Sequence, residues 1–176
     1  MSSLADRMIR AAKLDATLYE EVESDREAMG QAMSVVILSS LATGVGSSAR
    51  IGLTGLLWGT ITALTGWFVW AFLTYWIGTR ILPEPQTEAD MGQLLRTTGF
   101  SSSPGLLRAF GVLPGLWSLV VFLTGIWMLV AMVIAVRQAL DYSTTLRAVG
   151  VCALGWLVQG AMLLVLYGLS RTFPGT

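Results

Sequence analysis

Four long stretches of the chain carry no charged residue, and their lengths predict the architecture. They comprise 22, 29, 28 and 23 residues and cover 28–49, 51–79, 109–136 and 148–170. An α-helix rises about 1.5 Å per residue and the hydrocarbon core of a bilayer is about 30 Å thick, so each stretch is long enough to cross it. We therefore expect an all-α fold, a polytopic integral membrane helix bundle. Its long segments are expected at about 29–48, 51–78, 115–136 and 148–169.

A shorter membrane segment is expected over 99–113. Ser103 followed by Pro104 is a favourable helix start, because proline at the first helical position lacks only a donor that would be unpaired there. The dipeptide Pro114-Gly115 then indicates a tight turn. A helix over these residues rises only about 22 Å. We expect a short or incomplete third span, paired as a hairpin with the helix that follows, which gives five membrane segments in all.

Arg108 lies inside this short segment. An arginine at the bilayer centre costs about 2.5 to 3.5 kcal/mol on insertion scales, whereas near the end of a short helix it can extend to the lipid headgroups. Extension to the headgroups or pairing with backbone carbonyls is the simpler interpretation. A ligand site is the alternative.

Residues 1–28 are polar and predict two short helices before the first span. In the first helix, over about 3–14, apolar positions recur at helical spacing and basic residues take the other faces. This suits a basic amphipathic helix on an anionic leaflet or, alternatively, a frayed terminus. Asp15 is placed to cap the second helix.

Five acids follow within the second helix and the turn after it. They are Glu20, Glu21, Glu23, Asp25 and Glu27. Their helical spacing makes a site for a hard cation such as Mg²⁺ or Ca²⁺ conceivable. A solvated acidic helix is the simpler interpretation, since no turn loop or second carboxylate helix is evident. Such a helix is a candidate surface for binding a partner.

The polar linker after the second span predicts one more helix. A Pro-Glu-Pro run ends the preceding helix. Thr87 and Asp90 have the spacing of a capping box, and an apolar stripe follows them. We expect an amphipathic helix at the membrane interface over 87–98, with a partner contact as the alternative to simple membrane contact.

Basic residues set the expected topology. With five segments and a cytoplasmic N-terminus, eight basic residues face the cytoplasm and two face the opposite side, as the positive-inside rule favours. The eight are Arg7, Arg10, Lys13, Arg26, Arg80, Arg96, Arg137 and Arg147, and the two are Arg50 and Arg171. If 99–113 does not cross, the division is eight against three, a slightly poorer fit. We expect a multi-pass protein of the inner (plasma) membrane.

Composition narrows the chemistry. The chain is 54% hydrophobic and 12% charged, far from the globular average. It holds no histidine, which excludes Ser-His or Cys-His catalysis, His-ligated zinc and imidazole-ligated haem. The long apolar stretches contain no carboxylate, so the usual proton relay of secondary transporters is missing from the expected spans. We expect no enzyme activity, no catalytic residue, no metal or cofactor, and no nucleic-acid partner.

Small residues recur at four-residue spacing in the first two spans. Gly55 and Gly59 form one such pair, and Ser40 and Gly44 form the other. This spacing lets helices approach closely, either within the bundle or in a homo-oligomer.

Aromatic residues gather near the end of the second span. Trp67, Trp70, Tyr75 and Trp76 are typical of an interfacial aromatic belt. A pocket for a lipid or a chromophore is the alternative.

The order of these segments resembles a known family. The chain has an acidic N-terminal segment, two spans and an amphipathic linker, then GFSSSP at Gly99–Pro104 and VLPG at Val112–Gly115. A tryptophan-containing span, a short arginine-bearing loop and a last span follow. Nearly the whole chain thus resembles the Yip family, the Ypt-interacting membrane proteins, in its bacterial branch. The resemblance implies five spans and a cytoplasmic N-terminus. It links eukaryotic members to prenylated Rab-type GTPases, but their Asp-Leu-Tyr-Gly-Pro motif does not occur in this sequence.

These patterns favour a non-enzymatic membrane protein with a membrane-organising or partner-binding role. Its expected partners are the lipid bilayer and another membrane or cytoplasmic protein. One alternative is a small-solute or ion pathway in an oligomer, lined by Gln31, Ser34, Arg108 and Gln159. Another is an accessory subunit of a larger membrane complex.

Overall fold

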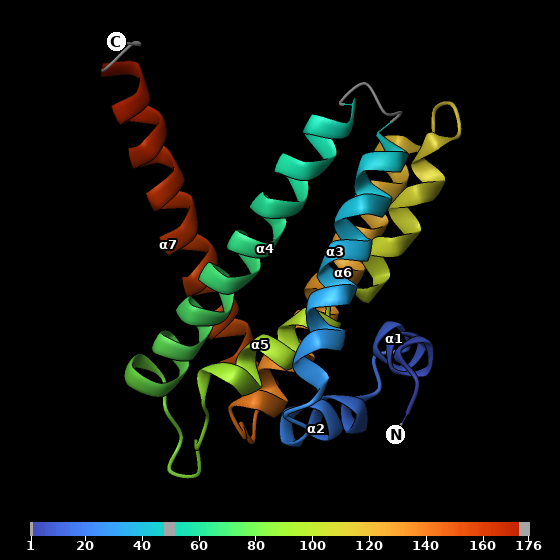
Figure 1. Ribbon diagram of the computed structural model, residues 1–176. Coiled ribbons are helices and arrows are strands. Elements are labelled where there is room, and N and C mark those ends of the chain that lie inside the picture. Colours follow the sequence, from blue (N-terminus) through green and yellow to red (C-terminus); the bar gives the residue numbers. More distant parts are fainter. Residues whose placement is uncertain (1, 48–51, 173–176) are drawn as a thin grey trace.

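The computed structural model describes residues 2–47 and 52–172, and all regular elements within them are helices (Figure 1). In chain order they are α1 Leu4–Ala12, α2 Ala16–Ser24, α3 Ala28–Gly46, α4 Gly52–Trp76, the π-helix η1 Ile77–Ile81, α5 Met91–Phe100, the 3₁₀ helix η2 Ser103–Val112, α6 Trp117–Ala139 and α7 Thr145–Thr172. The predicted all-α class is confirmed.

Four helical segments are long and apolar enough to cross a membrane. Within the described ranges they are Ala28–Gly46, Thr54–Ile81, Trp117–Ala139 and Thr145–Met162. Each coincides with one of the four uncharged stretches. The expected third segment, over 99–113, is not among them.

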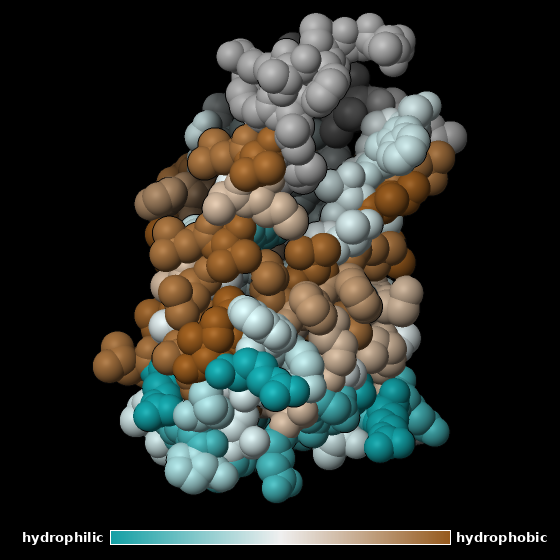
Figure 2. Space-filling model, turned by 90° about the vertical axis from the view of Figure 1, so that its left-hand side faces the viewer, coloured by the Kyte–Doolittle hydropathy of each residue, from teal (hydrophilic) through white to brown (hydrophobic). Residues whose placement is uncertain are grey.

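The molecule is polar at one end and apolar along its length. In Figure 1, α1, α2 and the connections after η1 and α6 lie at the lower end, while α4 and α7 diverge toward the upper end. Figure 2 shows the same lower end as a hydrophilic cap below a broad hydrophobic band. Arg50 and the side chain of Arg171, the two basic residues expected on the opposite face, lie outside what the structure describes.

The segment over 99–113 is not one short α-helix. Helix α5 ends at Phe100, and the chain continues as the 3₁₀ helix η2, which packs against α3 and α6 and rises beside them to the upper end (Figure 1). A 3₁₀ helix advances about 2.0 Å per residue against about 1.5 Å in an α-helix. The ten residues of η2 therefore extend about 20 Å, where an α-helix of the same length would cover about 15 Å.

Glycines let η2 and α3 touch through their backbones. A Cβ placed on Gly46 would lie 1.8 Å from the carbonyl oxygen of Arg108. One placed on Gly105 would lie 2.0 Å from Oγ of Ser39. Real Cβ atoms do not approach other atoms this closely, so the contact depends on the missing side chains. The path of η2 is thus fixed by its fit to α3.

The turn between η2 and α6 has the predicted form. The N–H of Leu116 donates to the carbonyl oxygen of Leu113 at 3.2 Å, and Gly115 has a φ of +80°. Proline at the second of the four turn residues and a positive φ at the third are the signature of a type II turn. The chain reverses here at the upper end of the molecule (Figure 1).

Helix α5 differs from the interfacial helix expected over 87–98. Its N-cap is Asp90, which forms a capping box with Gln93, and the side chain of Thr87 instead accepts from the N–H of Glu84 at 2.9 Å. From Leu94 to Phe100 every residue is buried. The hydroxyl of Thr97 is satisfied by donating to the carbonyl of Gln93 at 2.9 Å, one turn earlier. Because the threonine hydroxyls form hydrogen bonds within the helix, α5 can lie in the interior, where it contacts other helices.

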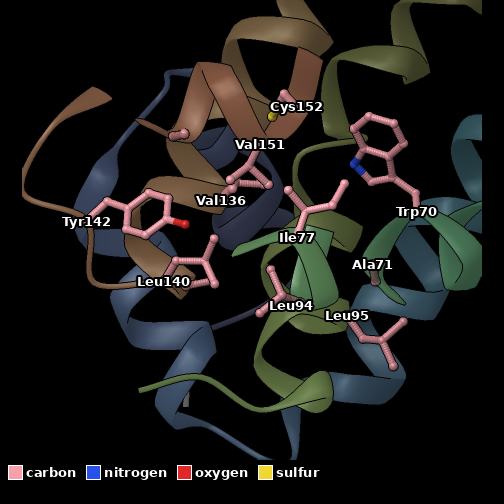
Figure 3. Close-up of a cluster of buried hydrophobic side chains, with 12 residues drawn as sticks. Trp70, Ala71, Ile77, Leu94, Leu95, Val136, Leu140, Tyr142, Val151 and Cys152 are labelled. Atoms are coloured by element: carbon pink, nitrogen blue, oxygen red, sulfur yellow. The ribbon is translucent and has the colours of Figure 1, made fainter. Parts of the chain in front are cut away.

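The largest buried apolar cluster lies where α4, α5, α6 and α7 meet (Figure 3). Ile77 and Leu94 belong to this cluster together with Val136 of α6 and with Leu140, which caps the end of α6. A second cluster, contributed by α1, α2, α3, α5 and α6, attaches the N-terminal helices to the bundle. Both clusters lie toward the polar end, so the bundle is held together most firmly there.

A polar contact ties the two loops of the polar end to each other. The backbone N–H and the hydroxyl of Ser143 donate to a carboxylate oxygen of Glu84 at 2.9 and 2.8 Å. These bonds lower the pKa of Glu84. The hydroxyl of Tyr142 reaches the carbonyl of Gly78 at 3.0 Å, where the π-helix leaves it available. The loops are therefore held as one surface.

Candidate functional site

Arg7 anchors the N-terminal helices. It is buried, and its guanidinium pairs with Asp25 at 2.7 Å and with Glu21 at 2.9 Å. It also donates to the side-chain oxygen of Gln31 at 3.0 Å. The sequence predicted a basic amphipathic helix with Arg7 on a face other than the apolar one, and the structure instead buries Arg7 against the partly exposed carboxylates of Glu21 and Asp25.

Arg10 completes this network. It pairs with Asp15 at 2.9 Å and with Glu21 at 2.5 Å. Hydrogen bonds from Ser2 and Arg10 lower the pKa of Glu21 to about 2. Two of the five acids proposed for partner binding, Glu21 and Asp25, are therefore already neutralised within the chain.

Arg96 holds α2 from the other side. This buried α5 side chain donates to the carbonyl of Val22 at 2.8 Å and to that of Glu23. Both carbonyls belong to the last turn of α2, where the helix dipole favours a cation. The guanidinium thereby fixes the end of α2 from which Glu23 projects.

Acids from three separate segments gather near α2. Glu23 has a pKa raised to about 7 by burial and by the charge of Asp141. The pKa of Asp141 is raised by burial and by Glu88 and Glu20. We call this group the acidic face, and its members are Glu20, Glu23, Glu88, Asp90 and Asp141.

Sequence analysis found only part of the acidic face. Glu20 and Glu23 were proposed, while Glu88, Asp90 and Asp141 were not. The topology offered a signal, since all three acidic segments fall on connections that a five-span chain brings to one side. Glu27 is exposed next to the start of α3. Within the described residues, no group of three or more carboxylate or thiol side chains is placed to hold a metal ion.

A cavity of about 630 Å³ lies among the helices of the bundle. Residues from α3, α4, α5, η2, α6 and α7 line it, together with the short link between α5 and η2. The lining is mostly small, hydroxyl-bearing and aromatic, with Arg108 and Gln159 as its strongly polar members. The cavity is therefore mainly apolar, with a few polar side chains on its wall.

Arg108 is bonded to a neighbouring helix. Its Nε donates to the hydroxyl of Thr124 at 3.2 Å. That hydroxyl donates in turn to the carbonyl of Val120 at 2.7 Å. Arg108 thus binds a side chain of α6 and lines the cavity, rather than pairing with a backbone carbonyl.

The proposed polar pathway is only partly assembled. Arg108 and Gln159 line the same cavity. Gln31 instead accepts from Arg7 at the polar end, and Ser34 donates to the carbonyl of Gly30 at 2.8 Å. The structure brings together two of the four residues.

The small residues of the first two spans serve two purposes. A Cβ on Gly44 would lie 2.3 Å from Cδ2 of Leu56, so this glycine allows close contact between α3 and α4. All four small residues, Ser40, Gly44, Gly55 and Gly59, also line the cavity. Gly59 has no atom within 4 Å of the place where its Cβ would stand, so it makes no tight helix contact among the described residues.

The aromatic residues near the end of the second span lie in two different environments. Trp67 and Trp70 line the cavity, and the indole N–H of Trp67 donates to the carbonyl of Leu95 at 3.1 Å. Trp76 is 49% exposed, as an interfacial aromatic residue would be. The pocket interpretation therefore fits two of the four residues.

Comparison with known proteins gives one clear result. The family model of the Yip1 domain matches residues 20–167, which is most of the chain. No curated protein and no solved structure matches the chain significantly. The matched range begins within α2 and ends within α7, so it takes in the acidic face, the cavity and all four apolar spans. The chain therefore belongs to the Yip1 domain family of membrane proteins.

Proposed function

We propose that this chain is a non-enzymatic, five-span protein of the inner (plasma) membrane that binds a membrane or cytoplasmic partner through its acidic face. The observation that carries the proposal is the convergence of acids from α2, the linker before α5 and the loop after α6 on one polar end. Carboxylates crowded together repel one another, and a basic partner relieves that repulsion.

The path of η2 supports five crossings. It carries the chain from the polar end to the opposite end, where α6 begins (Figure 1). Helix α1, which carries Arg7 and Arg10, lies at the polar end. The positive-inside rule then puts that end, and the N-terminus, in the cytoplasm.

Cysteine labelling tests the topology. In a background with Cys152→Ala, single cysteines replace Leu116 in the upper turn and Ser143 in the lower loop, both exposed positions. With five crossings, an impermeant maleimide should label Leu116→Cys in intact cells and leave Ser143→Cys protected. The reverse pattern would mean four crossings and would overturn the topology.

Charge reversal tests partner binding. Glu20→Lys with Glu88→Lys alters two exposed acids of the acidic face. Asp6→Lys with Glu27→Lys alters two exposed acids outside it by the same total charge. We expect crosslinks to partners in the native membrane to be lost in the first double variant and kept in the second. Equal crosslinking in both would refute the role of the acidic face.

A further inference from the structure

Among the residues that the structure describes, none in the cavity between α3, α4, η2, α6 and α7 carries a negative charge to balance Arg108. We propose that it binds one anionic phospholipid from the bilayer, with the lipid phosphate held by the Arg108 guanidinium. This goes beyond the proposed partner binding, which takes place at the other end of the molecule.

The guanidinium has donors to spare. Arginine carries five N–H groups, and among the described residues only the Nε of Arg108 has a partner, the hydroxyl of Thr124. No carboxylate lines the part of the cavity that the structure describes. A cation in apolar surroundings without a counter-ion is costly. The planar guanidinium binds phosphate oxygens through two parallel hydrogen bonds, which makes phosphate a matching anion.

The backbone fixes Arg108 at this place. Its carbonyl oxygen rests against Gly46 of α3, while its side chain reaches Thr124 of α6. Helix α3 thus fixes the backbone of Arg108, and α6 binds its side chain. Because Arg108 lines the cavity, its remaining N–H groups are available to a ligand there.

The cavity walls suit an amphiphile. Hydroxyl side chains, including Ser40 and Ser102, line the cavity together with Arg108, and Trp67, Trp70 and Met132 supply apolar surface. The α4 wall extends from Gly55 to Trp70, a length of about 22 Å at helical rise, which is enough to lie along an acyl chain. The volume of about 630 Å³ falls within the range of about 300 to 1,000 Å³ typical of small-molecule sites.

The position of the cavity selects a lipid over a soluble anion. Its lining comes from all four helices that are apolar enough to span the membrane. Figure 2 shows that the outer surface at this height is hydrophobic, with a small hydrophilic recess in the brown band. A ligand that reaches this depth must cross or come from the lipid phase, and phospholipids are the anionic molecules already present there.

The test is lipid binding to the purified, delipidated full chain, measured by native mass spectrometry and by titration. The probes are phosphatidylglycerol, phosphatidylcholine and diacylglycerol with the same acyl chains, with inorganic phosphate and oleate as competitors. We expect one phosphatidylglycerol per chain, bound more tightly than either of the other lipids and not displaced by the competitors. Arg108→Gln should weaken that binding roughly tenfold or more, the value of a charge-assisted hydrogen bond.

Two further variants separate binding from folding. Gly59→Leu places a bulky side chain in the cavity, since Gly59 lines it and no atom lies within 4 Å of its Cβ position, and leaves Arg108 in place. It should abolish phosphatidylglycerol binding while the thermal stability is kept. Arg80→Gln removes an exposed arginine that does not line the cavity, and it should bind like the parent.

Several outcomes would overturn the proposal. They are equal binding of phosphatidylcholine, unchanged binding in Arg108→Gln or Gly59→Leu, and displacement by phosphate or oleate. Loss of binding in Arg80→Gln to the same degree would mean non-specific charge attraction and would also overturn it. Because the protein is purified without partners, these results are independent of whether the acidic face binds one.

Discussion

The carbonyl oxygen of Arg108 lies directly against the backbone of Gly46, where even one methyl group on residue 46 would be 1.8 Å away. This contact joins the 3₁₀ helix η2 to the first long helix of the bundle. It also fixes the origin of the Arg108 side chain that lines the cavity. The contact is therefore both a structural and a functional constraint.

Gly46→Ala should destabilise the protein. The added methyl group collides with backbone, which cannot rotate away as a side chain can, so we expect a cost of about 1 to 3 kcal/mol. Gly30→Ala on the same helix is the matched control, because its Cβ position is open, and it should be neutral or stabilising by up to about 1 kcal/mol. Thermal unfolding of both variants in detergent measures the difference. Equal stability would show that η2 does not pack against Gly46 as described.

Arg7→Met should release the N-terminal helices from the bundle. It removes the hydrogen bonds of Arg7 to Glu21 and Asp25, and hydrogen bonds to charged groups contribute about 1.5 to 3 kcal/mol. Amide hydrogen exchange across α1 and α2 should speed up strongly, with little change in α6. Lys13→Met, at an exposed position, is the control. If both variants exchange alike, the Arg7 network does not hold the segment.

Stability should fall as the pH rises from about 5 to 8, and Glu23→Gln should reduce this fall. In the folded protein Glu23 has a pKa of about 7, against an ordinary value of 4.5. An acid whose pKa is raised by folding contributes stability that is complete below the ordinary pKa and lost as the pH passes the raised one. The charged groups that act on it are Asp141, Glu20, Asp90 and Arg96.

Melting temperatures at several pH values measure this effect. In Glu23→Gln the melting temperature should still fall as the pH rises, but less steeply, because the pKa of Asp141 is also raised by burial. The control is Glu27→Gln, at an exposed position outside the acidic face. A slope in Glu23→Gln as steep as in the parent would contradict the buried, acid-crowded setting of this residue.

Liposomes that contain the purified protein should leak no more solute or ion than empty liposomes. Only two of the four proposed pathway residues, Arg108 and Gln159, share the cavity, and Gln31 is engaged by Arg7. Release of an entrapped dye and of potassium would be measured, with Arg80→Gln as a control. A leak that disappears in Arg108→Gln or Gln159→Leu would establish a pathway in place of the proposed function.

The long spans were predictable because one physical signal dominates them. An uncharged stretch of 22 residues such as 28–49 has few options other than a membrane helix. The turn at Pro114-Gly115 was predictable for a similarly local reason, since proline and glycine restrict or permit particular backbone angles. These features depend on no distant contact.

The buried role of α5 and the 3₁₀ form of η2 depend on tertiary packing. The sequence around Thr97 suggested an exposed interfacial helix, but its hydroxyl bonds within its own helix and needs no water. The burial of Arg7 could not be predicted because its partners Glu21 and Asp25 come from α2 and the residue that ends it. The acidic face was found in part for the same reason, since Asp141 lies far along the chain from Glu20.

The 3₁₀ form of η2 also limits how its length can vary. Side chains three residues apart are eclipsed in such a helix, so Gly105, Arg108 and Gly111 form a single row. All three touch α3, through Ser39 and Gly46. Inserting or deleting one residue would rotate this row by a third of a turn and bring bulkier side chains against α3. Changes in length between Pro104 and Pro114 are therefore expected to be compatible with this packing only in steps of three residues.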